Sequence, residues 1–303
     1  MFNIPRLFLT LVLSALVLMA GSTTLSASPL IVGGKNFTEQ YILAECAQIL
    51  LEDAGIEAKT KTGVGSALAR KSLVNAQFDL YFEYTGTAYT VYYEQDDQAV
   101  MTHPDKVYEW VKSHDADKNL VWLDPIQFNN TYTLMMREKQ ADALGITSIS
   151  DFGAYVDENP DELLFATDVE FWERPDGFKA LMRTYDFRMP VDQIKKMSLG
   201  LTYKALREGQ VDVAMGFSTD GRIAAFGFVN LEDDKQFFPV YNPVPVVRED
   251  VLEQYPEIRD ILKPLAQKLD TNQMQQLNKA VDVDHKEVKA VATQWLQDNG
   301  LIE

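Results

Sequence analysis

From residue 30 onward, short apolar runs alternate with longer amphipathic segments, a pattern typical of α/β proteins. The first apolar run, residues 30–33, predicts a strand. The next segment carries apolar residues at helical spacing and predicts a helix that ends at Gly55. We expect Thr38 to cap the start of this helix, with Glu39 in its first turn.

The same alternation continues through the first third of the chain. Residues 57–62 and 78–84 predict two more strands, and residues 67–76 predict the helix between them. Strands separated by helices in this order form a parallel sheet with right-handed crossovers. The chain therefore opens with a βαβαβ unit.

A second set of elements begins near Asn130. Its expected strands are residues 132–137, 163–167 and 211–217, and its expected helices are residues 177–185 and 203–208. The segment VDVAMGF at 211–217 echoes FDLYFEY at 78–84, because each follows a helix and leads into a glycine-containing turn. This echo predicts two lobes of similar build. From about residue 252 the chain is expected to be helical, with apolar side chains at core spacing.

Residues 1–27 have the organisation of a secretory signal peptide. Arg6 supplies a positive charge, about fourteen apolar residues follow, and small residues come before Ser28. The apolar run is shorter than the roughly 20 residues of a membrane-spanning helix, although a retained anchor is the alternative. No cysteine lies near the expected cleavage region to carry a lipid. We therefore expect export to the periplasm.

Charge and cysteine content narrow the function further. The chain has 28 Lys and Arg against 45 Asp and Glu, a formal net charge of −17. An excess of negative charge disfavours nucleic acid and anionic membranes as partners. Cys46 is the single cysteine, so no internal disulfide is possible.

A search for catalytic and metal-binding motifs finds little. The three histidines, His103, His114 and His285, are scattered and have no second ligand at helical spacing. We expect His114 and Asp115 to lie on a solvated helix face, and Cys46 to be a packed thiol. Glycine-rich phosphate and dinucleotide motifs and the G-x-S-x-G motif are absent from the sequence. We therefore predict neither an enzyme nor a bound cofactor or metal.

Four aromatic residues stand where predicted strands meet polar turns. They are Tyr84, Tyr132, Phe217 and Tyr241. Ligands of open α/β sheets bind beyond the carboxyl ends of the strands. Aromatic faces there suit a quaternary ammonium, which has no N–H group to donate and is attracted by about 0.5–2 kcal/mol per desolvated ring. The alternative for each ring is ordinary core packing.

Several motifs together resemble one family, the glycine betaine/choline/carnitine-binding proteins of osmoprotectant ABC transporters. The chain carries GKNFTEQ at 34–40, EYTGT at 83–87, FNNTY at 128–132, FSTDGR at 217–222 and YNPVPVVR at 241–248. These segments resemble that family's motifs and occur in the same order across nearly the whole mature chain. Each is weak alone, and their combination is specific.

The resemblance implies a type II periplasmic-binding-protein fold, with two α/β lobes joined by two crossing hinge strands. Lobe one would comprise residues 29–129 plus 237–303, and lobe two residues 130–236. The implied partners are a small quaternary amine and a membrane-embedded ABC permease, with glycine betaine the first choice of ligand, then choline, carnitine or proline betaine. We expect a monomer.

The resemblance also implies roles for individual residues. Tyr84, Tyr132, Phe217 and Tyr241 would form an aromatic cage for the trimethylammonium group, with Asn130 as a polar neighbour. A ligand carboxylate would meet Lys35, Thr87 and Arg174, and Gln40 falls on a position that contacts ligand in some relatives. Thr87 follows a glycine at an expected helix start, which favours an anion. The alternatives are a surface ion pair for Arg174 and a solvated turn for Lys35.

Two positions depart from the family pattern. Phe217 stands where many relatives have a tyrosine, and so lacks a hydroxyl. Asn130 stands where some relatives have an acid, and so removes a charge near the cation. Two alternatives to a quaternary amine remain open: another polar solute such as an amino acid, whose α-amino group would need a carboxylate partner, and an enzyme on the same scaffold with a cofactor on Cys46.

Overall fold

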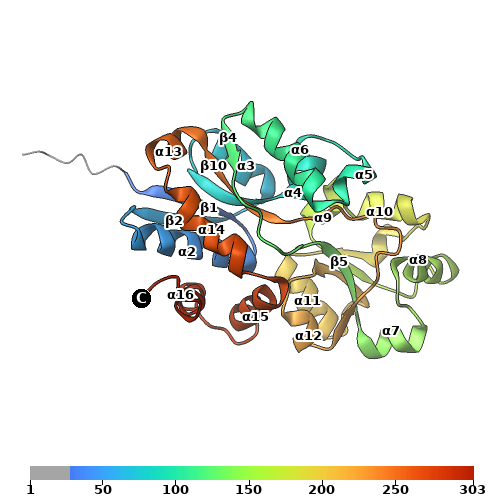
Figure 1. The fold of residues 1–303 in the computed structure, drawn as a ribbon. Coiled ribbons are helices and arrows are strands. Elements are labelled where there is room, and N and C mark those ends of the chain that lie inside the picture. Colours follow the sequence, from blue (N-terminus) through green and yellow to red (C-terminus); the bar gives the residue numbers. More distant parts are fainter. Residues whose placement is uncertain (1–27) are drawn as a thin grey trace, which may run out of the picture.

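The computed structural model describes residues 28–303, and the predicted signal peptide, 1–27, lies outside this range. Within the described residues the strands form two five-stranded sheets, and each sheet with its helices makes one lobe (Figure 1). Lobe one is built on the sheet ordered β2-β1-β3-β10-β4, and lobe two on the sheet ordered β7-β6-β8-β5-β9. The strands are β1 (Leu30–Lys35), β2 (Ala58–Val64), β3 (Leu80–Tyr84), β4 (Leu120–Trp122), β5 (Tyr132–Arg137), β6 (Phe165–Thr167), β7 (Ile194–Lys196), β8 (Val213–Phe217), β9 (Phe228–Asn230) and β10 (Pro243–Arg248).

The sheet of lobe one confirms the predicted βαβαβ unit. Strand β1 pairs in parallel with both β2 and β3. Strand β10, from much later in the chain, inserts antiparallel between β3 and β4. The helices before lobe two are α2 (Thr38–Asp53), α3 (Ser66–Val74), α4 (Thr85–Thr87), the π-helix η1 (Ala88–Tyr92), α5 (Gln98–Met101) and α6 (Pro104–Ala116).

Lobe two repeats this plan with a parallel centre and antiparallel additions. Strand β6 pairs in parallel with β7 and β8, while β5 lies antiparallel between β8 and β9. Its helical segments are α7 (Glu138–Leu144), α8 (Ile149–Glu158), α9 (Val169–Glu173), α10 (Phe178–Tyr185), the short 3-10 helix η2 (Val191–Gln193), α11 (Leu199–Arg207) and α12 (Arg222–Ala225).

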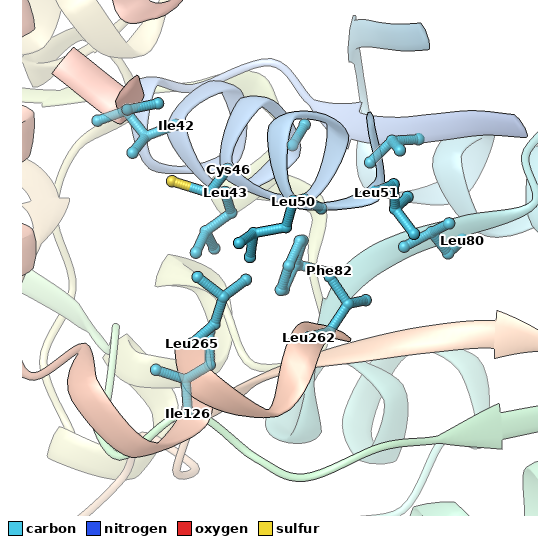
Figure 2. Packing of buried hydrophobic residues seen from close by; sticks show 14 of the residues in the cluster. Ile42, Leu43, Cys46, Leu50, Leu51, Leu80, Phe82, Ile126, Leu262 and Leu265 are labelled. Atoms are coloured by element: carbon cyan, nitrogen blue, oxygen red, sulfur yellow. The ribbon is translucent and has the colours of Figure 1, made fainter. Parts of the chain in front are cut away.

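The C-terminal helices return to lobe one, as Figure 1 shows for α14 and α16 beside α2. Figure 2 shows the resulting core, in which the apolar face of α2 meets strand β3 and helix α14. Cys46 is fully buried in this core, which confirms a packed thiol. These helices are α13 (Glu249–Gln254), α14 (Ile258–Lys268), α15 (Thr271–Asp282) and α16 (Val288–Asp298).

Two connections cross between the lobes and are hydrogen-bonded to each other. One follows β4 and the other precedes β10. The backbone N–H of Asn130 donates to the carbonyl of Tyr241 (3.0 Å), and the N–H of Tyr241 donates to Oδ1 of Asn129 (2.7 Å). This pairing fixes Asn130 and Tyr241 side by side at the junction of the two sheets.

Two local expectations are wrong. Thr38 is not the cap of α2: it is the first helical residue, Phe37 is the N-cap without a side-chain hydrogen bond, and the Thr38 hydroxyl donates to Asp282 on α15 (2.7 Å). Asp115 is not solvated, because it is fully buried in an ion pair with Arg70 and accepts from Trp122 (2.7 Å). In both cases a partner distant in sequence determines the position of the side chain.

Candidate functional site

A cavity of about 870 Å³ is lined by residues of both lobes. Residues at the ends of strands form part of its lining. Strand β1 ends at Lys35, strand β3 ends at Tyr84, and strand β5 begins at Tyr132. Tyr132 and Phe217 face each other as a registered pair of β5 and β8. Of the nine residues predicted for the site, eight line this cavity: Lys35, Tyr84, Thr87, Asn130, Tyr132, Arg174, Phe217 and Tyr241.

The aromatic residues of the cavity form a connected group. The centroid of the Tyr132 ring lies 5.0 Å from that of Phe217 and 5.7 Å from that of Tyr241, which stands edge-on at 86°. Tyr84 joins the group through Phe37, whose centroid is 6.0 Å from Tyr84 and 5.2 Å from Phe217. The four predicted rings therefore meet at one cavity, together with Phe37, which sequence reasoning placed in a motif but not in the site.

Neighbouring groups hold three of these rings in place. The Tyr84 hydroxyl donates to Oε1 of Glu39 (2.7 Å), and the Tyr241 hydroxyl donates to Oδ2 of Asp176 (2.6 Å). Tyr132 instead stacks on Phe171, with centroids 4.6 Å apart. Rings held in this way keep their faces in position before any ligand arrives, which lowers the ordering cost of binding.

Arg174 lies buried where the aromatic group meets the polar end of the cavity, with its Cζ 5.2 Å from the centroid of Tyr132 and 5.9 Å from that of Tyr241, and it is already paired. Its Nε and Nη2 donate to the two carboxylate oxygens of Asp176 (2.7 and 2.6 Å), and its Nη1 lies 3.5 Å from Oε1 of Glu170. The Thr87 hydroxyl is 3.4 Å from Nη2. Burial alone would raise the pKa of Asp176, but Arg174 outweighs it and lowers that pKa below its ordinary value. The surface ion pair considered for Arg174 is wrong, because the pair is internal.

Two further acids line the same end. Oε1 of Glu170, at the start of α9, accepts from the hydroxyl of Ser66 in lobe one (2.5 Å). Asp168 caps α9 by accepting from the N–H of Phe171 (2.7 Å), and burial raises the pKa of Asp168 to about 6. Sequence reasoning did not identify either acid as a site residue. Their positions show that this end of the cavity is polar and bridges the two lobes.

Lys35 and Gln40 support the site from lobe one. Lys35 is only 2% exposed, and its Nζ donates to Oε1 of Glu83 (2.5 Å), so the solvated-turn alternative is wrong. Gln40 is the one predicted residue that does not line the cavity. Its Nε2 lies within hydrogen-bond distance of the Phe82 carbonyl (2.9 Å) and the Tyr84 hydroxyl (3.1 Å). Gln40 therefore supports Tyr84 from behind.

Asn130 stands between the aromatic group and a buried acid. Its Nδ2 donates to Oε1 of Glu39 (2.9 Å), while its Oδ1 has no partner among residues 28–303. The other oxygen of Glu39 accepts from the hydroxyl of Thr219 in lobe two (2.7 Å). Burial raises the pKa of Glu39 to about 7 although these donors oppose the shift. Sequence reasoning placed Glu39 in a motif and in the first turn of a helix, but not in the site.

The described residues offer little for catalysis or membrane insertion. Across residues 28–303, no three His, Cys, Asp or Glu side chains are grouped to hold a metal. Burial raises the pKa of Cys46 to about 12, so its thiol is a poor nucleophile. In this same range no helix combines the length and apolar character needed to cross a bilayer.

The chain is similar to known transport proteins over nearly its whole length. Residues 28–298 match the family OpuAC, described as the substrate-binding domain of ABC-type glycine betaine transport system. A "Glycine-betaine-binding protein" of Pseudomonas aeruginosa PAO1 is 38% identical, over 98% of this chain and 96% of the relative. The "Glycine betaine-binding protein YehZ" of Escherichia coli K12 is 34% identical, over 91% and 92%.

A solved structure agrees in fold. A crystal structure described as a "glycine betaine/carnitine/choline ABC transporter" superposes with a TM-score of 0.73 at 28% identity, covering 90% of this chain and all of that one. These likenesses confirm the two-lobed α/β binding-protein fold, and they remove the enzyme alternative. The chain belongs to the family of substrate-binding domains of ABC-type glycine betaine transport systems.

Proposed function

We propose that this protein captures a small quaternary-ammonium solute, with glycine betaine the first choice, and delivers it to a membrane-embedded ABC permease. One observation carries the proposal: Tyr84, Tyr132, Phe217 and Tyr241, which come from distant parts of the sequence, line a single cavity between two sheets. A permanent cation without N–H groups matches such a lining, since ring faces attract it without hydrogen bonds.

The polar end of the cavity would receive the ligand carboxylate. Arg174 uses Nε and Nη2 on Asp176, so the N–H groups of Nη1 are the donors best able to turn from Glu170 to a ligand. The Thr87 hydroxyl, beside Nη2, would supply another donor. Lys35 would contribute positive charge at the cavity wall, although its Nζ stays on Glu83. Gln40 would act only by supporting Tyr84.

Ligand capture would be coupled to the arrangement of the lobes. We assign residues 29–129 plus 237–303 to lobe one and residues 130–236 to lobe two. Tyr84 and Tyr241 then approach the cation from one side, and Tyr132 and Phe217 from the other. A ligand that contacts both walls favours the closed arrangement by its differential affinity for it.

Export of the mature chain to the periplasm follows from the leader-like residues 1–27. The net charge of −17 supports a protein that does not bind nucleic acid. We expect the mature chain to act as a monomer, presenting its closed surface to the permease.

Isothermal titration calorimetry of the mature chain tests the proposal. We expect saturable binding of glycine betaine, and weaker or comparable binding of choline, carnitine or proline betaine. Absence of heat with all four ligands at millimolar concentration would contradict it. Competition with primary amino acids checks the alternative ligand class. An α-amino group would need an acid as its partner, and Glu170 and Asp168 line the polar end of the cavity, so binding of primary amino acids in place of the four quaternary amines would favour that alternative.

A further inference from the structure

Glu39 is a buried carboxylate that receives donors from three parts of the chain. Its Oε1 accepts from the Tyr84 hydroxyl on β3 (2.7 Å) and from Nδ2 of Asn130 in the crossing segment (2.9 Å). Its Oε2 accepts from the Thr219 hydroxyl after β8 (2.7 Å). Glu39 is 2% exposed and does not line the main cavity, so it lies directly behind residues that do.

The position of Glu39 determines which atom of Asn130 can face a ligand. An ionised carboxylate only accepts hydrogen bonds, so the amide must turn its Nδ2 toward Glu39. Its Oδ1 is then directed to the opposite side, and this atom is buried without a partner among the described residues. Asn130 itself is 4% exposed and lines the cavity beside Tyr132. A buried acceptor without a donor is costly, and the positive charge spread over the methyl groups of a quaternary ammonium would offset part of that cost without a hydrogen bond.

We propose that Glu39 is a positioning residue for ligand binding, which in its ionised form holds the Asn130 carboxamide with Oδ1 toward the cation and places a negative charge behind the aromatic group. This inference rests on the proposed function, because it assumes a cationic ligand. The polarised methyl groups around a quaternary nitrogen meet a carbonyl oxygen favourably and an NH₂ group unfavourably. Protonated Glu39 could donate to Oδ1 instead, and would let the amide turn its NH₂ toward the ligand.

Burial raises the pKa of Glu39 to about 7, so both protonation states are accessible near neutral pH. A bound cation favours the ionised form, and ligand affinity should therefore rise as pH increases through this pKa. If only the ionised form binds well, the apparent Kd at pH 6 is up to about tenfold higher than at pH 8.

Several other ionisable groups lie near Glu39. Asp220, Arg222 and Asp282 share a small cavity with it, and Arg222 pairs with both acids. Lys35 lies over the Tyr84 ring but is paired with Glu83. Asn278 on α15 also contacts the acid and is uncharged. Asp168, whose pKa is raised to about 6, lies on the main cavity and titrates below Glu39.

The test is the pH profile of Kd for glycine betaine and for choline between pH 5.5 and 8.5, on the mature wild-type chain and on Glu39→Gln. Glu39→Gln keeps the size and polarity of the side chain and removes the charge. We expect a step in affinity near pH 7 for the wild type. In Glu39→Gln the step should vanish, and affinity at pH 8 should stay below that of the wild type. A step centred on Asp168 would persist in this variant.

Glu45→Gln is the matched control, since it removes the same charge from the same helix. Oε1 of Glu45 accepts from the Thr60 hydroxyl (3.1 Å), away from the cavity. Thermal melting of each variant verifies folding. If Glu39→Gln does not fold, calorimetry of the wild type at pH 7 in buffers of different ionisation enthalpy still tests the inference, because cation binding should release a fraction of a proton.

Failure of this inference and failure of the proposed function give different results. Binding with a pH profile shared by wild type and Glu39→Gln overturns the inference and leaves the proposed function standing. No binding of glycine betaine, choline, carnitine or proline betaine at any pH overturns the proposed function itself. In an Asn130→Ala background the step should be much smaller, and a step of unchanged size would show that Glu39 does not act through Asn130.

Discussion

The aromatic end and the ionic end of the cavity are built on different principles. At the aromatic end, Tyr132, Phe217 and Phe37 contact one another through ring faces and edges and carry no charge. At the ionic end, Arg174 is neutralised by Asp176 before any ligand is present. A cation at the aromatic end would therefore share the rings with Arg174, whose Cζ lies 5.2 Å from the centroid of Tyr132, and with Lys35, whose Nζ lies 4.9 Å from that of Tyr84. A carboxylate at the ionic end would meet only the donors that the internal pairs leave over.

The largest expected effect is the loss of unfolding free energy when Arg174 is removed from its internal ion pair. Arg174→Met leaves the buried Asp176 without its cation, and removing one partner of a buried ion pair costs about 3–5 kcal/mol of unfolding free energy. Chemical denaturation measures this loss. The double variant Arg174→Met/Asp176→Leu should recover part of it, because no charge is stranded.

Lys179→Met is the matched control for this prediction. Lys179 pairs with Glu173 on the exposed surface of the same lobe, with side chains 40% and 59% exposed. Exposed pairs contribute little, so the unfolding free energy should hardly change. Equal losses of unfolding free energy in Arg174→Met and Lys179→Met would show that the internal pair stabilises the fold no more than the exposed pair does.

A smaller effect is expected from the acid behind the aromatic end. The folded chain holds the proton of Glu39 more tightly than the unfolded chain, because burial raises its pKa from 4.5 to about 7. This contribution stabilises the fold at low pH and is lost as pH rises through 7. Without ligand, the unfolding free energy of the wild type minus that of Glu39→Gln should fall by up to about 3 kcal/mol between pH 4.5 and 8. A flat difference would contradict the raised pKa.

The smallest effect separates two tyrosines of the aromatic group. Tyr241→Phe removes the hydroxyl that donates to Asp176 (2.6 Å), which should cost about 1.5–3 kcal/mol of unfolding free energy because a hydrogen bond to a charged group is lost. Tyr132 is held chiefly by stacking on Phe171, so Tyr132→Phe should change stability much less. Thermal unfolding of the pair measures the difference. A larger loss in Tyr132→Phe would reverse the roles assigned to the two hydroxyls.

Much of the fold was predictable because it is encoded in local patterns. Apolar runs gave β1, β3, β5 and β8, and helical spacing gave α2. The aromatic group was predictable for a related reason, since a ring at the end of a strand in an α/β sheet lies at the edge where ligands bind. The family motifs then predicted that four such rings lie together, which sequence periodicity alone could not do.

Pairing across the fold could not be predicted. Asp115 follows His114 in a polar helix, and only the tertiary structure brings Arg70 against it. Glu39 has an ordinary place in a first helical turn, yet its partner Thr219 lies 180 residues away. A charged residue at an apolar face of α2 was the available signal for Glu39. Whether such a residue has a partner, and whether its pKa is raised, depends on neighbours that the sequence does not specify.

The central claim is that the aromatic end binds a positive charge and not merely a trimethyl shape. Comparing glycine betaine with 3,3-dimethylbutanoate at pH 7.5 tests this directly, because the two molecules share shape and carboxylate while a carbon replaces the charged nitrogen. Calorimetric titration should give glycine betaine an advantage of at least about 2 kcal/mol, roughly a thirtyfold lower Kd. Equal affinity for the two would contradict the claim.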